Sequence, residues 1–395
     1  MSLAPAVPAQ PGDTGAGTLL LRPGPKRRSA GPAFRGDNAR GMPRSHLLTR
    51  TRIETGRDAW QAFVEASEEA WLWHHYDLQD ALAAWPGRHD LSFAVHDPDA
   101  GGRIVAIVPL HLQEGRAAGF LRWDVLDSLG GPACQNGLGT AYKRKVLAVA
   151  RDSLASLARR HDAVKIDLAL SPMAPALRGP ACPRANPLLD LGCENTLTHT
   201  WVTDLCRPPE AIRAAYSTLT KRELRAAQLS PYEIREAAGA ADLATYYELH
   251  CRTYHRTGAI PHPLRYFQII FEEFVPAGLS RVVFLVREGR VLAAQNTGRF
   301  KGACVYWTGA SCSDRDGGEN RLLFDEQIFH AADHGFTWYE LGEAFPNVEQ
   351  GKLKGLNDFK RSFGGSLYPY YRGRIVLKKR WHASLALYRA LRGQA

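Results

Sequence analysis

Apolar and polar positions alternate in a way that predicts a strand, helix and strand in the last third of the chain. Residues 303–310 alternate as a strand does, and residues 320–334 have the apolar spacing of a helix, with Gly335 where that helix ends. The next strand is predicted at residues 336–342. The loop before the helix favours ligand binding, because backbone amides at a helix start have no partner within the helix.

The same order of elements occurs in both halves of the chain. Each half is predicted to hold helices, a hairpin with a glycine in its turn, and then a further helix and strand. The hairpins are expected at residues 91–110 and 281–296, and a basic amphipathic helix is expected at 210–229. The repeat therefore predicts a mixed α/β fold of two similar lobes.

Composition places the boundaries of these lobes along the 395 residues. Residues 1–48 contain seven Pro and seven Gly without an apolar period, which is typical of a disordered tail, because such a segment buries too little surface to offset its ordering entropy. We expect a first lobe at 49–199, a second lobe at 200–378 and a basic C-terminal helix at 379–395.

Positive charge is concentrated in the second half and in the tail. The chain carries a formal net charge of +10, and residues 206–395 hold 27 basic and 19 acidic side chains, with no acid after Asp358. A basic lobe suits a polyanionic partner such as RNA, a nucleotide-linked precursor or an anionic membrane face. The alternative is a solvated basic surface without a specific partner.

Several functional classes are disfavoured by what the sequence lacks. The seven cysteines are scattered without a C-x-x-C pair, which argues against disulfides or a zinc cluster and for a reducing, cytoplasmic compartment. His74 and His75 have no metal-ligand spacing around them, so no metal site is expected. There is no P-loop, no G-x-S-x-G and no apolar run near the roughly 20 residues that span a bilayer. At most, the chain would contact a membrane peripherally.

A series of motifs in the second half occurs in a recognisable order. They are Val-Leu-Ala-Ala at 291–294, Tyr-Trp-Thr-Gly-Ala-Ser at 306–311, Asn-Arg-Leu-Leu at 320–323, Tyr-Glu-Leu-Gly at 339–342 and a Phe-Lys-x-x-Phe-Gly-Gly run at 359–365. With the basic helix at 222–227, this order resembles the second lobe of the Fem-type (FemABX-like) aminoacyl and acyl transferases of the GNAT-fold superfamily. The resemblance covers about residues 55–372, and we find no heptad pattern for the coiled-coil arm of some members.

The resemblance implies a fold and a reaction. The fold would be two tandem GNAT-like lobes with a cleft between them, and the reaction would transfer an acyl group to an amine. The implied donor is aminoacyl-tRNA, whose ester is attacked by an amine of a peptide, a cell-envelope precursor or a small molecule, without a bound cofactor and without DNA. An acyl-CoA-dependent N-acyltransferase acting on an amino sugar or polysaccharide precursor is the alternative. A catalytically silent RNA-binding protein would leave the strand, helix and strand unexplained.

The resemblance also points to individual residues. Lys360 matches the family's lysine, and we expect it to stabilise the intermediate or the leaving group, with a surface lysine as the alternative. Phe359 and Phe363 would anchor its helical turn from the opposite side. Glu340 is expected to accept a proton from the amine. The residues expected to bind substrate are Arg222, Arg256, Tyr306, Asn320, Lys354 and Arg361. The cations among them would bind phosphate or carboxylate groups, and the alternative for each cation is a solvated surface charge.

Overall fold

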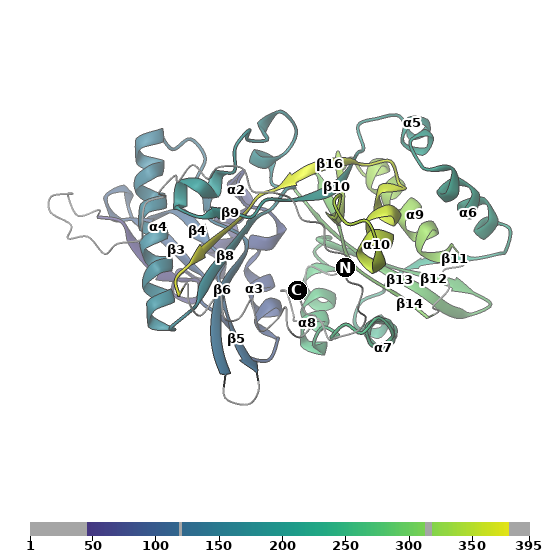
Figure 1. Cartoon of the computed structure of the whole chain (residues 1–395), viewed down its shortest axis with the longest axis horizontal. Coiled ribbons are helices and arrows are strands. Elements are labelled where there is room, and N and C mark those ends of the chain that lie inside the picture. The colour runs from purple at the N-terminus through teal and green to yellow at the C-terminus, as the bar shows by residue number, and fades with distance from the viewer. Residues whose placement is uncertain (1–45, 118–120, 313–317, 379–395) are drawn as a thin grey trace, which may run out of the picture.

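The computed structural model of the protein describes residues 46–117, 121–312 and 318–378. Two α/β lobes stand next to each other, as the duplicated order of elements predicts (Figure 1). Most of the expected tail at 1–48 and the whole expected helix at 379–395 lie outside the described residues. Leu48 already belongs to a strand that pairs with the first lobe. None of the described helices is both long and apolar enough to cross a membrane.

Two sheets form the first lobe. The smaller sheet has the order β1-β3-β4-β7, with strands Leu48–Thr51, Phe93–Asp97, Arg103–Val108 and Ala133–Cys134. The larger has the order β2-β5-β6-β8-β17-β9, with strands Arg88–Asp90, His111–Ala117, Leu121–Gly130, Lys165–Leu170, Arg372–Val376 and Glu194–Asn195. Helices α2 (Arg57–Ala66), α3 (Tyr76–Ala83) and α4 (Thr140–Arg160) belong to this lobe. The hairpin predicted at 91–110 is confirmed as β3 and β4.

One seven-stranded sheet forms the second lobe, in the order β11-β12-β13-β14-β15-β10-β16. Its strands are Glu233–Glu236, Ser280–Arg287, Arg290–Phe300, Ala303–Ser311, Trp338–Ala344, Thr198–Asp204 and Ser366–Tyr370. Its helices are α5 (Pro209–Ala214), α6 (Thr218–Gln228), α7 (Ala240–Arg256), α8 (Leu264–Ile269), α9 (Glu319–Asp333) and α10 (Gly351–Arg361). The predicted strand, helix and strand are confirmed as β14, α9 and β15, and the two strands are parallel.

The basic helix expected at 210–229 is two helices instead of one. α5 ends at Ala214, and α6 begins after Ser217, whose side chain accepts a hydrogen bond from the backbone N–H of Thr220. Ser217 has φ −61° and ψ 154°, an extended backbone that interrupts the helix. A serine with this geometry satisfies one of the free amides of the new helix, so the break is stable.

The last described strand crosses from one lobe to the other. The chain leaves the second sheet at the end of β16 and enters the first sheet as β17, where it lies between β8 and β9 (Figure 1). Ile375 pairs with Ile166 of β8 and is buried. The sequence placed residues 372–376 in the second lobe, but the structure places them in the first lobe's sheet, because pairing with β8 buries the apolar side of β17.

The lobes also share one hydrophobic core. The indole rings of Trp73 and Trp307 meet edge to face at 5.4 Å, one from each lobe. Trp71 donates its indole N–H to the backbone carbonyl of Phe300 at 2.9 Å. The ammonium of Lys301, in the β13–β14 turn, donates to three backbone carbonyls at and beyond the end of α2. Contacts of this kind fix the orientation of the second lobe against the first.

Candidate active site

The two parallel strands of the second lobe separate soon after they begin. β14 and β15 pair only at Ala303 with Trp338, Cys304 with Tyr339 and Val305 with Glu340. Beyond this point β14 follows β13 as far as Ser311, whereas β15 follows β10 to its end. The facing backbone edges therefore diverge within the sheet. Backbone N–H and C=O groups along such edges need other partners, and a bound substrate can supply them.

Helix α10 lies beside this opening and is held by buried contacts. The carboxamide oxygen of Asn357 accepts hydrogen bonds from the indole of Trp201 at 3.0 Å and from the backbone N–H of Phe345 at 2.9 Å. The rings of Phe359 and Phe363 lie 5.3 Å and 5.1 Å from the ring of Phe324 on α9. The spacing of these two phenylalanines anchors one side of the helix, as the sequence predicts, and leaves Lys360 directed elsewhere.

Lys360 is buried against the end of β15. Only 1% of this residue is exposed, and its ammonium donates to the backbone carbonyl of Glu343 at 2.9 Å. Burial lowers the pKa of Lys360 to about 8, although the charges of Glu343 and Glu340 act in the opposite direction. The alternative of a solvated surface lysine is therefore wrong, because the side chain lies in the interior.

Gly342 makes room for this lysine. Its backbone has φ +94°, in the region that favours glycine, and a Cβ at this position would lie 2.8 Å from the Lys360 nitrogen. The pairing register of β10 with β15 shifts here, between Trp201 and Val202. An irregular strand pair therefore turns the backbone of β15 so that the ammonium can approach it closely.

Glu340 is buried on the same strand. It is 2% exposed, and the hydroxyl of Thr200 donates to its carboxyl oxygen at 2.8 Å. Burial raises the pKa of Glu340 to about 7, although the Thr200 hydrogen bond and the charges of Lys360 and Arg372 oppose the shift. The guanidinium of Arg372, on β17, lies 3.1 Å from the carboxylate of Glu343, on β15. We call Thr200, Glu340, Glu343, Lys360 and Arg372 the lysine cluster.

The residues expected to bind substrate do not all gather around this cluster. Tyr306 lies on β14 just past the point of divergence, its ring is 4.7 Å from Phe324, and burial raises its pKa. Asn320 stands in the first turn of α9 and is partly buried. Arg256 ends α7 and donates to the backbone carbonyl and hydroxyl of Ser311 at 2.9 Å and 3.1 Å, so it caps the far end of β14.

The other three expected cations lie on the surface. Lys354 and Arg361 are exposed on α10 and share Asp358, with which Lys354 forms an ion pair and from which Arg361 lies 3.3 Å away. Arg222 is exposed on α6. The structure thus brings Glu340 and Lys360 together, packs Tyr306 against Phe324 of α9, and leaves these three cations outside the cluster.

Sequence reasoning missed three members of the lysine cluster. Thr200 comes from β10, Glu343 follows the Tyr-Glu-Leu-Gly motif directly, and Arg372 comes from the strand that crosses between lobes. Of these three residues, only Glu343 had a local signal in the sequence, because it directly follows Gly342 at the end of the Tyr-Glu-Leu-Gly motif. In the described residues, no group of three or more His, Cys, Asp or Glu side chains is placed to hold a metal ion.

Comparison with known proteins bears on the fold. Residues 213–361 match the family model described as an acetyltransferase (GNAT) domain. The chain is similar to the crystal structure of FemX, with 15% identity, a TM-score of 0.61, and coverage of 85% of this chain and 98% of that chain. No curated protein matches the sequence.

Two further solved structures are similar, each with 15% identity and a TM-score of 0.51. One is the C-terminal domain of a putative lysylphosphatidylglycerol synthetase from Agrobacterium fabrum, with coverage of 86% of this chain and 96% of that chain. The other is L-PGS from Bacillus licheniformis, with coverage of 87% and 98%. Residues 213–361 therefore match a GNAT acetyltransferase domain, and the chain as a whole shares its two-lobed fold with FemX.

Proposed function

We propose that this acyltransferase moves an aminoacyl group from aminoacyl-tRNA to an amine of a peptide, a cell-envelope precursor or a small molecule. The observation that carries the proposal is the buried pair of Lys360 and Glu340 beside the divergence of β14 and β15. Transfer of an ester to an amine needs positioning and charge stabilisation more than a protein nucleophile. A buried cation next to a buried carboxyl supplies both charge stabilisation and a proton acceptor.

The reaction would proceed by direct attack. The amine nitrogen forms a bond to the ester carbonyl carbon, and the bond from that carbon to the ribose oxygen then breaks. The negative charge that develops on the carbonyl oxygen would be stabilised by the Lys360 ammonium. One proton moves from the nitrogen to the leaving ribose oxygen, and Glu340 can relay it, because its pKa of about 7 lets both forms exist near neutral pH.

The other residues that the sequence predicts to bind substrate are assigned to positions around the lysine cluster. Lys352, in the first turn of α10, donates to the backbone carbonyl of Thr257 at 2.7 Å and so joins α10 to the end of α7. Arg256 and Lys354 lie on the two helices that meet there, and we assign them to donor phosphates. We assign Arg222 and Arg361 to other anionic parts of the substrates, and Tyr306 and Asn320 to the cleft wall.

A cytoplasmic site of action fits the cysteines. All seven lie in the described residues and are unpaired, which suits a reducing compartment. Charged tRNA is a donor of that compartment. Peripheral contact with an anionic membrane face remains compatible with the basic charge of the second lobe.

An acyl-CoA donor is the second candidate, favoured by the acetyltransferase description of the matching family. The test incubates the purified full chain with a labelled aminoacyl-tRNA pool or with acyl-CoAs, each with a panel of amine acceptors that includes amino sugars. We expect labelled amide product from the charged tRNA. Product from acyl-CoA alone, with none from charged tRNA, would replace the first proposal with the second.

A further inference from the structure

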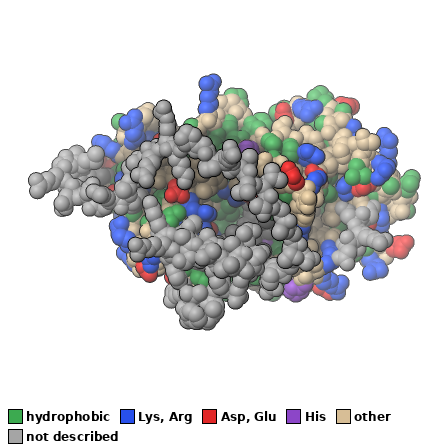
Figure 2. All heavy atoms as spheres, viewed as in Figure 1, with side chains coloured by type: hydrophobic (Ala, Val, Ile, Leu, Met, Phe, Trp, Pro, Cys, Tyr) green, Lys and Arg blue, Asp and Glu red, His purple; other side chains and the backbone are tan. Residues whose placement is uncertain are grey.

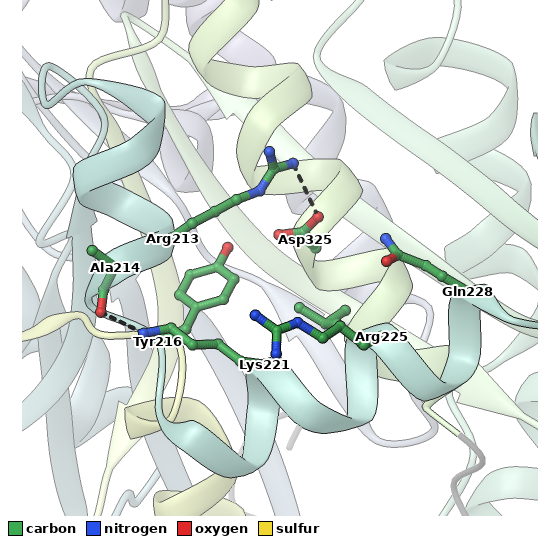
Figure 3. A pocket seen from close by; sticks show the side chains of 8 residues that line it. Arg213, Ala214, Tyr216, Lys221, Arg225, Gln228 and Asp325 are labelled. Carbon is green, nitrogen blue, oxygen red and sulfur yellow. Dashed lines mark hydrogen bonds and ion pairs between the residues drawn. The ribbon is translucent and has the colours of Figure 1, made fainter.

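A hollow on the second lobe lies between the α5–α6 turn and α9 (Figure 3). It has a volume of about 540 Å³. Its polar lining consists of Arg213, Tyr216, Lys221, Arg225, Gln228 and Asp325, which we call the α6 pocket. Three of these side chains are cationic and one is anionic, so the pocket has an excess of positive charge. In the space-filling view, Lys and Arg side chains recur along the outer edge of the second lobe (Figure 2).

Two of the three cations are held in place by the protein. Lys221 donates to the backbone carbonyl of Ala214 at 2.8 Å. The guanidinium of Arg213 lies 3.4 Å from Asp325 and 4.0 Å above the ring of Phe329. Charged side chains fixed in this way lose little further freedom when they bind a ligand.

The third cation is available for a ligand. Arg225 is exposed and has no ion pair or side-chain hydrogen bond with another described residue. Tyr216 is 3% exposed, its burial raises the pKa of its hydroxyl, and Figure 3 shows this hydroxyl directed toward Asp325. Once Arg213 has balanced the charge of Asp325, Lys221 and Arg225 leave two positive charges, which suits a phosphate group.

The wall of the pocket is joined to the helix that carries Lys360. The backbone N–H of Ser217 donates to the carbonyl of Ser362 at 2.8 Å, and the hydroxyl of Thr220 donates to the hydroxyl of Ser362 at 2.7 Å. The rings of Tyr216 and Phe363 lie 5.4 Å apart. A ligand in the α6 pocket is therefore held on the same rigid packing unit as the end of α10.

We propose that the α6 pocket is a subsite for a phosphate group of the donor substrate, an inference that rests on the proposed function. Its role is to hold the donor while the acyl group reacts near Lys360. The phosphate can belong to the backbone of tRNA or to an acyl-CoA, and the chemistry of recognition is the same for both. Arg225 makes the direct contact, and Lys221 and Arg213 provide the fixed positive field.

The test compares Arg225→Ala with Arg103→Ala, which removes the same charge from an exposed position on β4 of the first lobe. Affinity for deacylated tRNA and for CoA is measured with the full chain at several salt concentrations. Losing one phosphate contact lowers the slope of log affinity against log salt by about one, and lowers affinity about tenfold near 0.1 M salt. We expect this loss for one donor with Arg225→Ala, a raised KM, and an unchanged kcat.

Each result decides the proposal. A loss confined to tRNA identifies an RNA phosphate, and a loss confined to CoA identifies a nucleotide phosphate. If Arg225→Ala and Lys221→Met both bind the two donors as Arg103→Ala does, the pocket is not a donor subsite. Binding of inorganic tripolyphosphate gives a readout that does not depend on the donor. If the wild-type chain does not bind it, or binds it as the pocket variants do, the subsite is overturned while the transfer assay still tests the function.

Discussion

Replacing Lys360 by methionine tests the central role of the buried ammonium. Methionine keeps much of the length and apolar volume of the lysine, whereas alanine would leave a cavity at a residue that is 1% exposed and cost roughly 2–5 kcal/mol of stability. The substitution also removes the hydrogen bond to the carbonyl of Glu343. A loss of activity in a folded Lys360→Met variant can then be assigned to the charge and its hydrogen bonds.

The expected size of the effect follows from the burial of the lysine. Its pKa is about 8 in the folded chain against the ordinary 10.5, so the charged form is destabilised by about 3 kcal/mol relative to water. Negative charge that develops next to the ammonium can recover up to that amount in the transition state. We therefore expect kcat to fall by about a hundredfold or more, which matches the typical loss of one oxyanion donor.

The pH profile gives a second readout. The ammonium of Lys360 is present below its pKa, so the wild-type rate should fall as pH rises through about 8. The carboxylate of Glu340 is present above its pKa, so the rate should rise through about 7. Lys360→Met should lose the alkaline limb and keep the acidic one.

The assay measures kcat at saturating donor, together with the melting temperature, for Lys360→Met and for a matched control. Lys145→Met serves as the control, because Lys145 is exposed on α4 of the first lobe. Wild-type turnover in a folded Lys360→Met variant would refute the role of the ammonium. So would a reduced rate that still declines above pH 8, because another group would then cause the alkaline limb.

Three further predictions concern stability. The pKa of Glu340 is raised from 4.5 to about 7, so between these pH values the folded chain keeps a proton that the unfolded chain loses. The free energy of unfolding therefore decreases as pH rises from 4.5 through 7. Glu340→Gln should remove up to about 3 kcal/mol of this decrease, measured by urea unfolding at several pH values. An unchanged pH dependence would contradict this. Gly342→Ala should lower the stability measured by thermal unfolding by roughly 2 kcal/mol or more, because the φ of Gly342 is +94° and the new Cβ would lie 2.8 Å from the Lys360 nitrogen. The control is Gly355→Ala on α10, where the new Cβ would have open space and should not destabilise the protein. Equal melting temperatures for these two variants would refute the role of Gly342. Lys301→Met should cost about 1–3 kcal/mol in urea unfolding, because three backbone carbonyls of the first lobe lose a charged donor, and an unchanged midpoint would show that they find other partners.

The sequence by itself determined the local elements around the site. The alternation at 303–310, the helical spacing at 320–334 and the glycine at 335 correctly predicted β14, α9 and β15. The paired phenylalanines on either side of Lys360 correctly predicted an anchored turn. Such features depend on neighbouring residues, since periodicity and helix ends are set by the local backbone. The order of the motifs also carried the resemblance to Fem-type transferases.

Only the tertiary structure decided which charges are buried and which residues meet them. Lys360 and Arg361 are adjacent in the sequence, yet one lies in the interior and the other in solvent. Thr200 and Arg372 reach the lysine cluster from strands that are distant from it in the sequence. Strand β17 joins the larger sheet of the first lobe, although in the sequence it comes directly after the last strand of the second lobe. Burial, and with it each pKa near the site, depends on elements brought together by packing across both lobes, which no local pattern encodes.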